Sequence, residues 1–130
     1  MAEQPHVTDL ALLWLLAGFQ LKHMLGDYVL QNAYMLQHRR VWGHPGGLAH
    51  VAVHAALTLP LLLIAGVHGL LFPAILVGEA LFHYHVDWVK DGLIARDGLT
   101  PSDRRYWWIS GIDQLLHQLS YLVIVGLIAA

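Results

Sequence analysis

The chain has 130 residues, of which 57% are hydrophobic and only 12% are charged, about half the charged share of an ordinary soluble domain. It has no cysteine, which excludes disulfides and thiolate metal ligands. The formal net charge is −2 and no basic run is present, so we expect no nucleic-acid partner. This much apolar sequence at this length predicts an all-α integral membrane protein with a single domain over residues 1–130.

Four segments are long and apolar enough to cross a bilayer, which takes about 20 helical residues. In chain order they cover about residues 10–33, 48–65, 70–90 and 109–130. Polar turns rich in glycine or proline separate them at residues 39–47, 66–69 and 91–105. The sequence therefore predicts a four-transmembrane-helix bundle.

Basic residues mark the orientation of this bundle. The loops after the first and third segments carry five arginines, whereas the N-terminal tail, the second turn and the C-terminus carry no Lys or Arg. The positive-inside rule then predicts a multi-pass protein of the cell (inner) membrane with both termini on the non-cytoplasmic side. The N-terminus has neither a basic start nor a small-residue cleavage pattern, so we expect no removable signal peptide.

Each predicted span carries two ionisable residues four positions apart, which places them on one helix face. A rise of 1.5 Å per residue gives the depth of each side chain. One predicted layer, roughly 20 Å from the outer face, holds His23, His54, His83 and His117. A second layer, about one turn closer to the cytoplasm, holds Asp27, His50, Asp87 and Asp113.

Ionisable groups at this depth are expected to face the bundle interior and to find partners. Imidazole and carboxylate are common ligands of zinc, iron and manganese, and helical bundles build such sites from inward-facing side chains. We therefore predict a mono- or dinuclear site for a divalent transition metal, zinc foremost and iron or manganese as alternatives. All eight residues are candidate ligands, and the candidate catalytic groups are Asp27, His50, Asp87 and Asp113. We expect support around the ligands from Gln31, Glu79, Lys90 and Gln114.

Two other interpretations fit part of this pattern. Asp–His hydrogen bonds could simply join the helices, which predicts fewer groups at scattered depths. A proton or ion pathway also uses intramembrane acids and histidines, but the outer halves of the spans are almost wholly apolar. Lys22, beside His23, either pairs with Glu79 or snorkels inward, whereas Lys90 is expected to snorkel to the lipid headgroups.

Four motifs resemble those of an uncharacterised bacterial membrane family, domain of unknown function 3307. They are His-x-x-x-Asp with Gly26 and Gln31, then His-x-x-x-His, then Glu-x-x-x-His-x-x-x-Asp-x-x-Lys, and finally Asp-Gln-x-x-His. Tyr28 stands where the family motif has Phe. The resemblance covers nearly the whole chain and supports the bundle and the choice of positions, but it implies no activity.

The leading functional hypothesis is a metal-dependent membrane hydrolase acting on a membrane lipid or amphipathic small molecule near the cytoplasmic leaflet. A metal lowers the pKa of bound water and polarises a carbonyl or phosphoryl oxygen. The alternatives are a metal-ion or proton transporter or channel, which would require a homo-oligomer, and a di-iron membrane oxidoreductase. A structural interaction protein is a further possibility.

Overall fold

The computed structural model describes residues 8–130, which fold into helices joined by short turns, with no strand in this range. In chain order the elements are α1 (Asp9–Met24), the π-helix η1 (Leu25–Val29), α2 (Ala33–His38), α3 (Pro45–Ile64), α4 (Leu71–Arg96) and α5 (Arg104–Ala129). The all-α fold predicted from the sequence is confirmed. The expected absence of a signal peptide concerns residues outside the described range.

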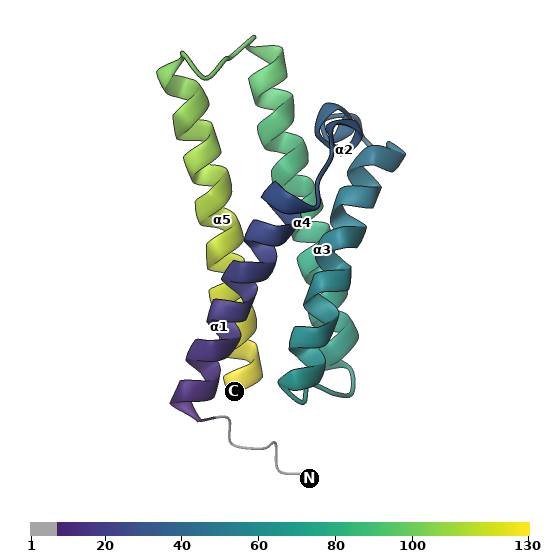
Figure 1. Cartoon of the computed structure of the whole chain (residues 1–130), viewed down its shortest axis with the longest axis vertical. Helices are drawn as coiled ribbons and strands as arrows, with labels where there is room; N and C mark the ends of the chain where they lie inside the picture. The colour runs from purple at the N-terminus through teal and green to yellow at the C-terminus, as the bar shows by residue number, and fades with distance from the viewer. Residues whose placement is uncertain (1–7) are drawn as a thin grey trace.

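The four long helices lie side by side (Figure 1). α3 packs against α4, α4 against α5, and α1 against both α3 and α5, which closes the bundle. The short helix α2 packs against α3. Two of the helices, α3 and α5, are long and apolar enough on length and composition alone to cross a membrane.

The helix at the first predicted span, residues 10–33, ends earlier than expected. α1 ends at Met24 and continues into a single wide π turn, in which Leu30 N donates to Leu25 O at 2.8 Å. The chain then leaves the helix, and Asn32 Oδ1 accepts from Met35 N at 3.0 Å to begin α2. Isolated π turns are frequent at functional sites, and this one contains Asp27.

The other helices begin earlier or end later than predicted. α4 continues to Arg96 and α5 begins at Arg104, because both helices extend by charged turns beyond their apolar segments. α3 begins at Pro45, where His44 Nδ1 accepts from Gly46 N at 3.0 Å. The turn at residues 66–69 is as short as expected, and its two glycines adopt positive φ of 70° and 64°.

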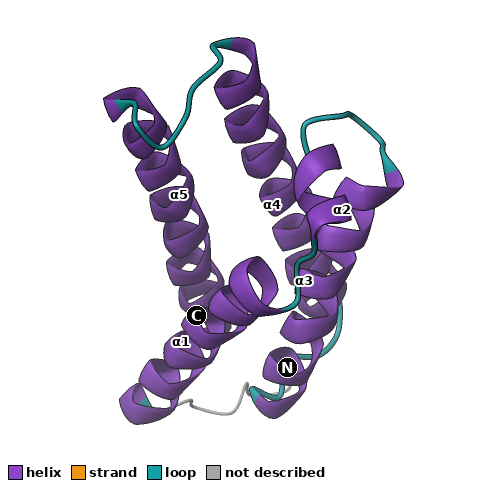
Figure 2. Ribbon diagram, turned by 45° about the horizontal axis from the view of Figure 1, so that its top comes forward, coloured by secondary structure: helices purple, strands orange, loops and turns teal. Residues whose placement is uncertain are grey.

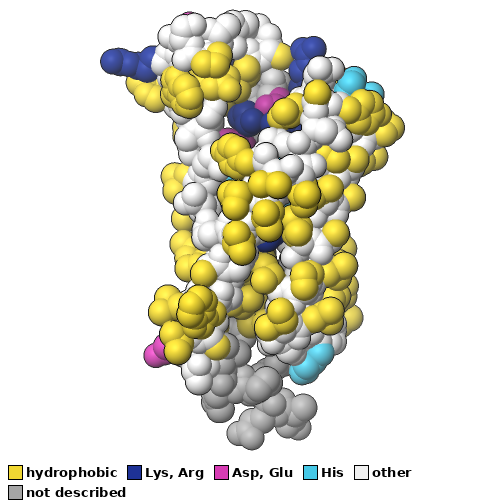
Figure 3. Space-filling view, viewed as in Figure 1, with side chains coloured by type: hydrophobic (Ala, Val, Ile, Leu, Met, Phe, Trp, Pro, Cys, Tyr) yellow, Lys and Arg dark blue, Asp and Glu magenta, His cyan; other side chains and the backbone are white. Residues whose placement is uncertain are grey.

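The core and the surface of the bundle are both apolar. One end of the interior is filled by a cluster that includes Leu15, Phe19, Leu62, Ile75, Tyr121 and Ile124. Large apolar side chains are also exposed along the helices, and Figure 3 shows them over most of the visible face. The helix ends on either side of the turn between α4 and α5 carry Arg96, Arg104 and Arg105, at the opposite end from the apolar cluster.

Candidate metal centre

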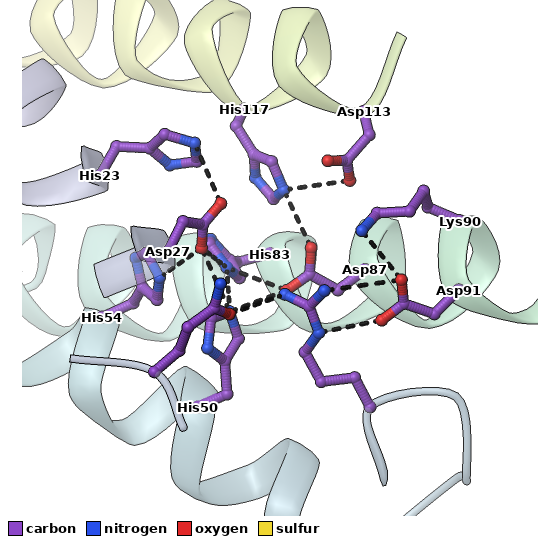
Figure 4. Close-up of polar contacts among 12 residues, drawn as sticks. His23, Asp27, His50, His54, His83, Asp87, Lys90, Asp91, Asp113 and His117 are labelled. Atoms are coloured by element: carbon purple, nitrogen blue, oxygen red, sulfur yellow. Dashed lines mark hydrogen bonds and ion pairs between the residues drawn. The ribbon is translucent and has the colours of Figure 1, made fainter. Parts of the chain in front are cut away.

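The four long helices and η1 bring all eight predicted ligands into one buried cluster (Figure 4). None of these residues is more than 5% exposed. Asp27 comes from η1, and the rest come in pairs or singly from the neighbouring helices: His23 from α1, His50 and His54 from α3, His83 and Asp87 from α4, Asp113 and His117 from α5.

The four histidines of the first predicted layer lie together. The ring of His83 is 3.9 Å from that of His54 and 4.2 Å from that of His117, measured between centroids. The ring of His23 is 5.1 Å from that of His117. The histidines predicted to lie at the same depth on the four helices are therefore close together in the structure.

The carboxylates lie against these imidazoles. Asp27 Oδ1 is 2.9 Å from His54 Nε2 and 3.3 Å from His50 Nε2. Asp87 Oδ2 is 3.0 Å from His50 Nε2 and 3.1 Å from His83 Nε2. His50 thus connects two carboxylates that come from different helices.

Asp113 joins the cluster through α5. Its Oδ1 atom lies 3.5 Å from His117 Nε2, and the same nitrogen lies 3.3 Å from Asp87 Oδ1. Asp87 therefore has imidazoles on both of its oxygens, which makes it the central carboxylate of the cluster.

Three overlapping groups have ligand atoms within 4.8 Å of one another: Asp27 with His50, His54 and His83; His23 with His83 and His117; and Asp87 with Asp113 and His117. Neutral imidazole and carboxylate suit zinc, iron and manganese. The buried groups could therefore hold a metal ion.

Several buried polar atoms of the cluster have no hydrogen-bond partner among the described residues. They are Asp113 Oδ1, whose contact with His117 Nε2 is long at 3.5 Å, and the Nδ1 atoms of His50, His54 and His83. Buried polar groups in native proteins are nearly always satisfied, so such atoms leave room for an ion or water as a partner. The donor set and its unsatisfied atoms fit a metal.

Arg39 is a component that sequence reasoning missed, because we assigned it to a cytoplasmic loop. It is 7% exposed and follows α2. Its Nη1 atom is 3.5 Å from Asp87 Oδ2, and its Nε atom is 2.9 Å from Asp91 Oδ2. Burial opposes the charge, but the carboxylates of Asp87 and Asp91 outweigh it and raise the pKa of the guanidinium above its ordinary value.

Glycines in α3 allow Arg39 to come this close. A Cβ on Gly46 would lie 2.9 Å from Tyr34 O, and one on Gly47 would lie 3.5 Å from Arg39 Cα. The backbone of α2 and of the residues after it therefore packs directly on the start of α3. No short sequence motif signals this long-range approach.

A further polar layer lies on the other side of the cluster. Lys22 pairs with Glu79, one of the two alternatives left open by the sequence, and Thr58 Oγ1 donates to Glu79 Oε2 at 2.6 Å. Tyr121 OH lies 2.8 Å from His23 Nδ1. Thr58 and Tyr121 continue the four-residue spacing of the ligands by one more turn, which is the signal that could have identified them.

The four predicted supporting residues differ in their contacts. Gln114 Oε1 lies 3.0 Å from His23 Nε2, so Gln114 contacts a candidate ligand directly. Gln31 reaches the cluster only through Arg39, at 3.4 Å, and Lys90 Nζ pairs with Asp91 Oδ1 at 2.8 Å. Glu79 is engaged by Lys22 and Thr58.

The chain matches the family described as "Protein of unknown function (DUF3307)" over residues 15–130, and it belongs to that family. This confirms the resemblance carried by the four motifs. No curated protein and no solved structure matches the chain.

Proposed function

Starting from this family, which has no assigned activity, we propose that the chain is a metal-dependent enzyme of the inner membrane, a hydrolase acting on a lipid or amphipathic substrate at the cytoplasmic leaflet. The observation that carries the proposal is the convergence of buried imidazole and carboxylate atoms from four helices, in three groups that each lie within 4.8 Å. Hydrogen bonding between helices needs far fewer groups than this.

Charge balance supports a bound cation. The polar interior holds five carboxylates, Asp27, Glu79, Asp87, Asp91 and Asp113, and three cations, Lys22, Arg39 and Lys90. With neutral histidines the formal excess is two negative charges, and buried charge without compensation is costly. One divalent metal removes this excess. Two protonated imidazoles would also remove it, so metal analysis has to separate the two cases.

The proposal takes all four long helices as membrane spans, adding α1 with η1 and α4 to α3 and α5. α1 and η1 run without a break over 21 residues, about 30 Å of helix, enough for the hydrocarbon core. α4 has 26 residues. The exposed apolar side chains on all four helices would be unfavourable in water and favourable in lipid.

Each part of the cluster then has a role in hydrolysis. A divalent metal bound here would supply a water of lowered pKa and polarise the bond to be cleaved. The histidines would hold that metal, the carboxylates of Asp27 and Asp87 would fix the orientation of those histidines, and a carboxylate left off the metal would accept a proton from water. Asp113 suits this last task because its Oδ1 atom has no hydrogen-bond partner.

Transport is the weaker alternative. A route along the bundle axis would have to cross the apolar cluster around Phe19, Leu62 and Tyr121, each 0% exposed. It would therefore have to run between copies of the chain. Redox chemistry at a di-iron centre uses similar ligands, and the identity of the metal distinguishes it from hydrolysis.

The test is metal analysis of the purified protein in detergent, together with the variants His54→Ala and His83→Ala. We expect stoichiometric zinc in the wild type and loss of most metal in both variants. The matched control is His85→Ala, because His85 lies on the same helix as His83 but is exposed, with Nδ1 2.6 Å from Leu81 O. Hydrolysis is then assayed as release of fatty acid or phosphate from phospholipid vesicles.

Three outcomes would count against the proposal. Full metal content in both variants would refute the metal centre. Iron with charge-transfer absorption would favour the oxidoreductase, and metal uptake into vesicles that disappears in His54→Ala would favour transport.

A further inference from the structure

α4 and α5 form an apolar groove on the outside of the bundle that reaches the candidate metal centre. Toward the turn between the two helices, the groove has a volume of about 320 Å³ and includes Phe82, Val89, Ile112 and Asp113. Figure 2 shows the two helices spreading apart toward this turn. Asp113 is thus both a candidate ligand and part of the groove wall.

The groove continues along the other half of the same helix pair. A second stretch of about 400 Å³ shares Phe82 and Leu116 with the first and also includes Glu79. The first stretch covers α4 from Phe82 to Leu93, about 17 Å of helix, which matches half of a hydrocarbon core about 30 Å thick. Its length therefore suits the acyl chain of a lipid in one leaflet.

The inner end of the groove is cationic. Lys90 lines it, and the Lys90 ammonium has three N–H donors, of which the contact with Asp91 Oδ1 uses one. The other donors can bind an anionic headgroup oxygen. In the same stretch Asp113 lines the groove, while its buried Oδ1 atom lies 3.5 Å from His117 Nε2, so this residue joins the groove to the candidate metal centre.

We propose that the α4–α5 groove is the lipid-binding site of the enzyme, taking one acyl chain of an inner-leaflet lipid whose anionic headgroup lies between Lys90 and Asp113. This inference rests on the proposed function, since it assigns the substrate class of the same centre. The substrate enters sideways from the bilayer, and its headgroup meets the ligands without crossing the bundle.

The test uses photoactivatable phosphatidylglycerol, with a diazirine at the end of one acyl chain, in phosphatidylcholine vesicles that contain the full-length protein. Adducts are mapped by peptide mass spectrometry. We expect them to concentrate around Phe82 and Leu116, at the end of the stretch away from Lys90 where the acyl chain ends, and to be displaced by unlabelled phosphatidylglycerol. Adducts spread evenly around the bundle, or a cross-link between two chains through this groove, would overturn the proposal.

Matched variants make the test specific. Val89→Trp and Ile112→Trp fill the groove and should reduce labelling several-fold, whereas Val77→Trp, in the separate apolar groove between α3 and α4, should not. Equal loss in Val77→Trp would overturn the proposal. Because both groove residues are exposed, 49% for Val89 and 58% for Ile112, substitution should leave the fold intact.

A separate variant tests the contact between Lys90 and the lipid headgroup. Lys90→Gln should reduce the preference for phosphatidylglycerol over phosphatidylcholine by about fivefold, the factor equivalent to about 1 kcal/mol for one cation at an anionic membrane surface. Arg96→Gln, which removes an exposed cation bonded to Asp97, is the control. An unchanged preference in Lys90→Gln would refute the headgroup site.

Metal content, measured on the same samples, separates the two proposals. Selective labelling of the groove without bound metal would support the lipid site and refute the metal centre. Bound metal without selective labelling would refute the lipid site alone.

Discussion

Gly26 allows the sharpest test of the centre, because a change there alters the geometry without removing a ligand. It lies in η1, next to Asp27. A Cβ built on Gly26 would lie 2.4 Å from both Cε1 and Nε2 of His54, whereas ordinary contacts begin at 3.4 Å. Gly26→Ala therefore requires a displacement of about 1 Å in His54 or in the π turn.

His54 has little freedom to make that displacement. Its side chain is 1% exposed, its ring lies 3.9 Å from that of His83, and its Nε2 atom is 2.9 Å from Asp27 Oδ1. A shift of about 1 Å is enough to break that contact. Movement of the π turn instead would displace Asp27 itself, so either response disturbs a candidate ligand.

We expect Gly26→Ala to weaken metal binding by about 10- to 100-fold, the range seen when groups that orient metal ligands are altered. Crowding should also destabilise the fold by about 1–3 kcal/mol. Gly111→Ala is the control, since a Cβ there meets nothing within 4 Å, and a helical Gly→Ala change is neutral or stabilising by about 0.5–1 kcal/mol.

The assay is competition for zinc against a chelator of known affinity, with thermal unfolding in detergent measured in parallel. The parallel measurement shows whether the variant folds. A folded Gly26→Ala variant with wild-type zinc affinity would refute a metal site that depends on His54 and on its orientation by Asp27.

Two further predictions concern the rest of the bundle. Lys22→Met leaves Glu79 buried without its cation and should lower the free energy of unfolding by about 3–5 kcal/mol. The double variant Lys22→Met/Glu79→Gln should recover part of this loss. If the effects of the two substitutions on the free energy of unfolding were fully additive, the pairing would be contradicted. Because the chain has no cysteine, His68→Cys and Ser102→Cys each introduce a single label site, and a membrane-impermeant maleimide should reach His68→Cys only from outside and Ser102→Cys only from the cytoplasm. Labelling of both from one side would refute the proposed four spans.

The sequence predicted that the eight candidate ligands lie together, because their relative positions follow from two simple quantities. Turn positions fix where each helix begins, and the helical rise fixes how deep each pair lies. Pairs four residues apart share a face, so His83 and Asp87 had to point the same way. Errors of a few residues at helix ends, such as the extension of α4 to Arg96, do not change the relative depth of the pairs.

The sequence did not predict the π turn or the burial of Arg39, because neither follows from the periodicity of a helix. The π turn around Asp27 is a local change in hydrogen bonding, and neither composition nor spacing marks it. Arg39 reaches Asp87 only because α2 folds back onto Gly46 and Gly47, a contact between segments that the pattern of apolar residues does not relate. An arginine after an apolar span ordinarily indicates orientation, and this one has a second role in the site.

Arg39 also bears on how a substrate reaches the centre. Toward the end of the bundle at the turn between α3 and α4, the interior beyond the Lys22–Glu79 pair is filled by apolar side chains such as Phe19 and Leu62. Toward the end at the turn between α4 and α5, the Arg39 guanidinium lies over Asp87 and is held by Asp91. Both axial directions are thus occupied by protein, whereas the groove between α4 and α5 reaches Asp113 from the side. A transporter needs an axial path and an enzyme acting on bilayer lipids needs a lateral one, so this arrangement favours the enzyme.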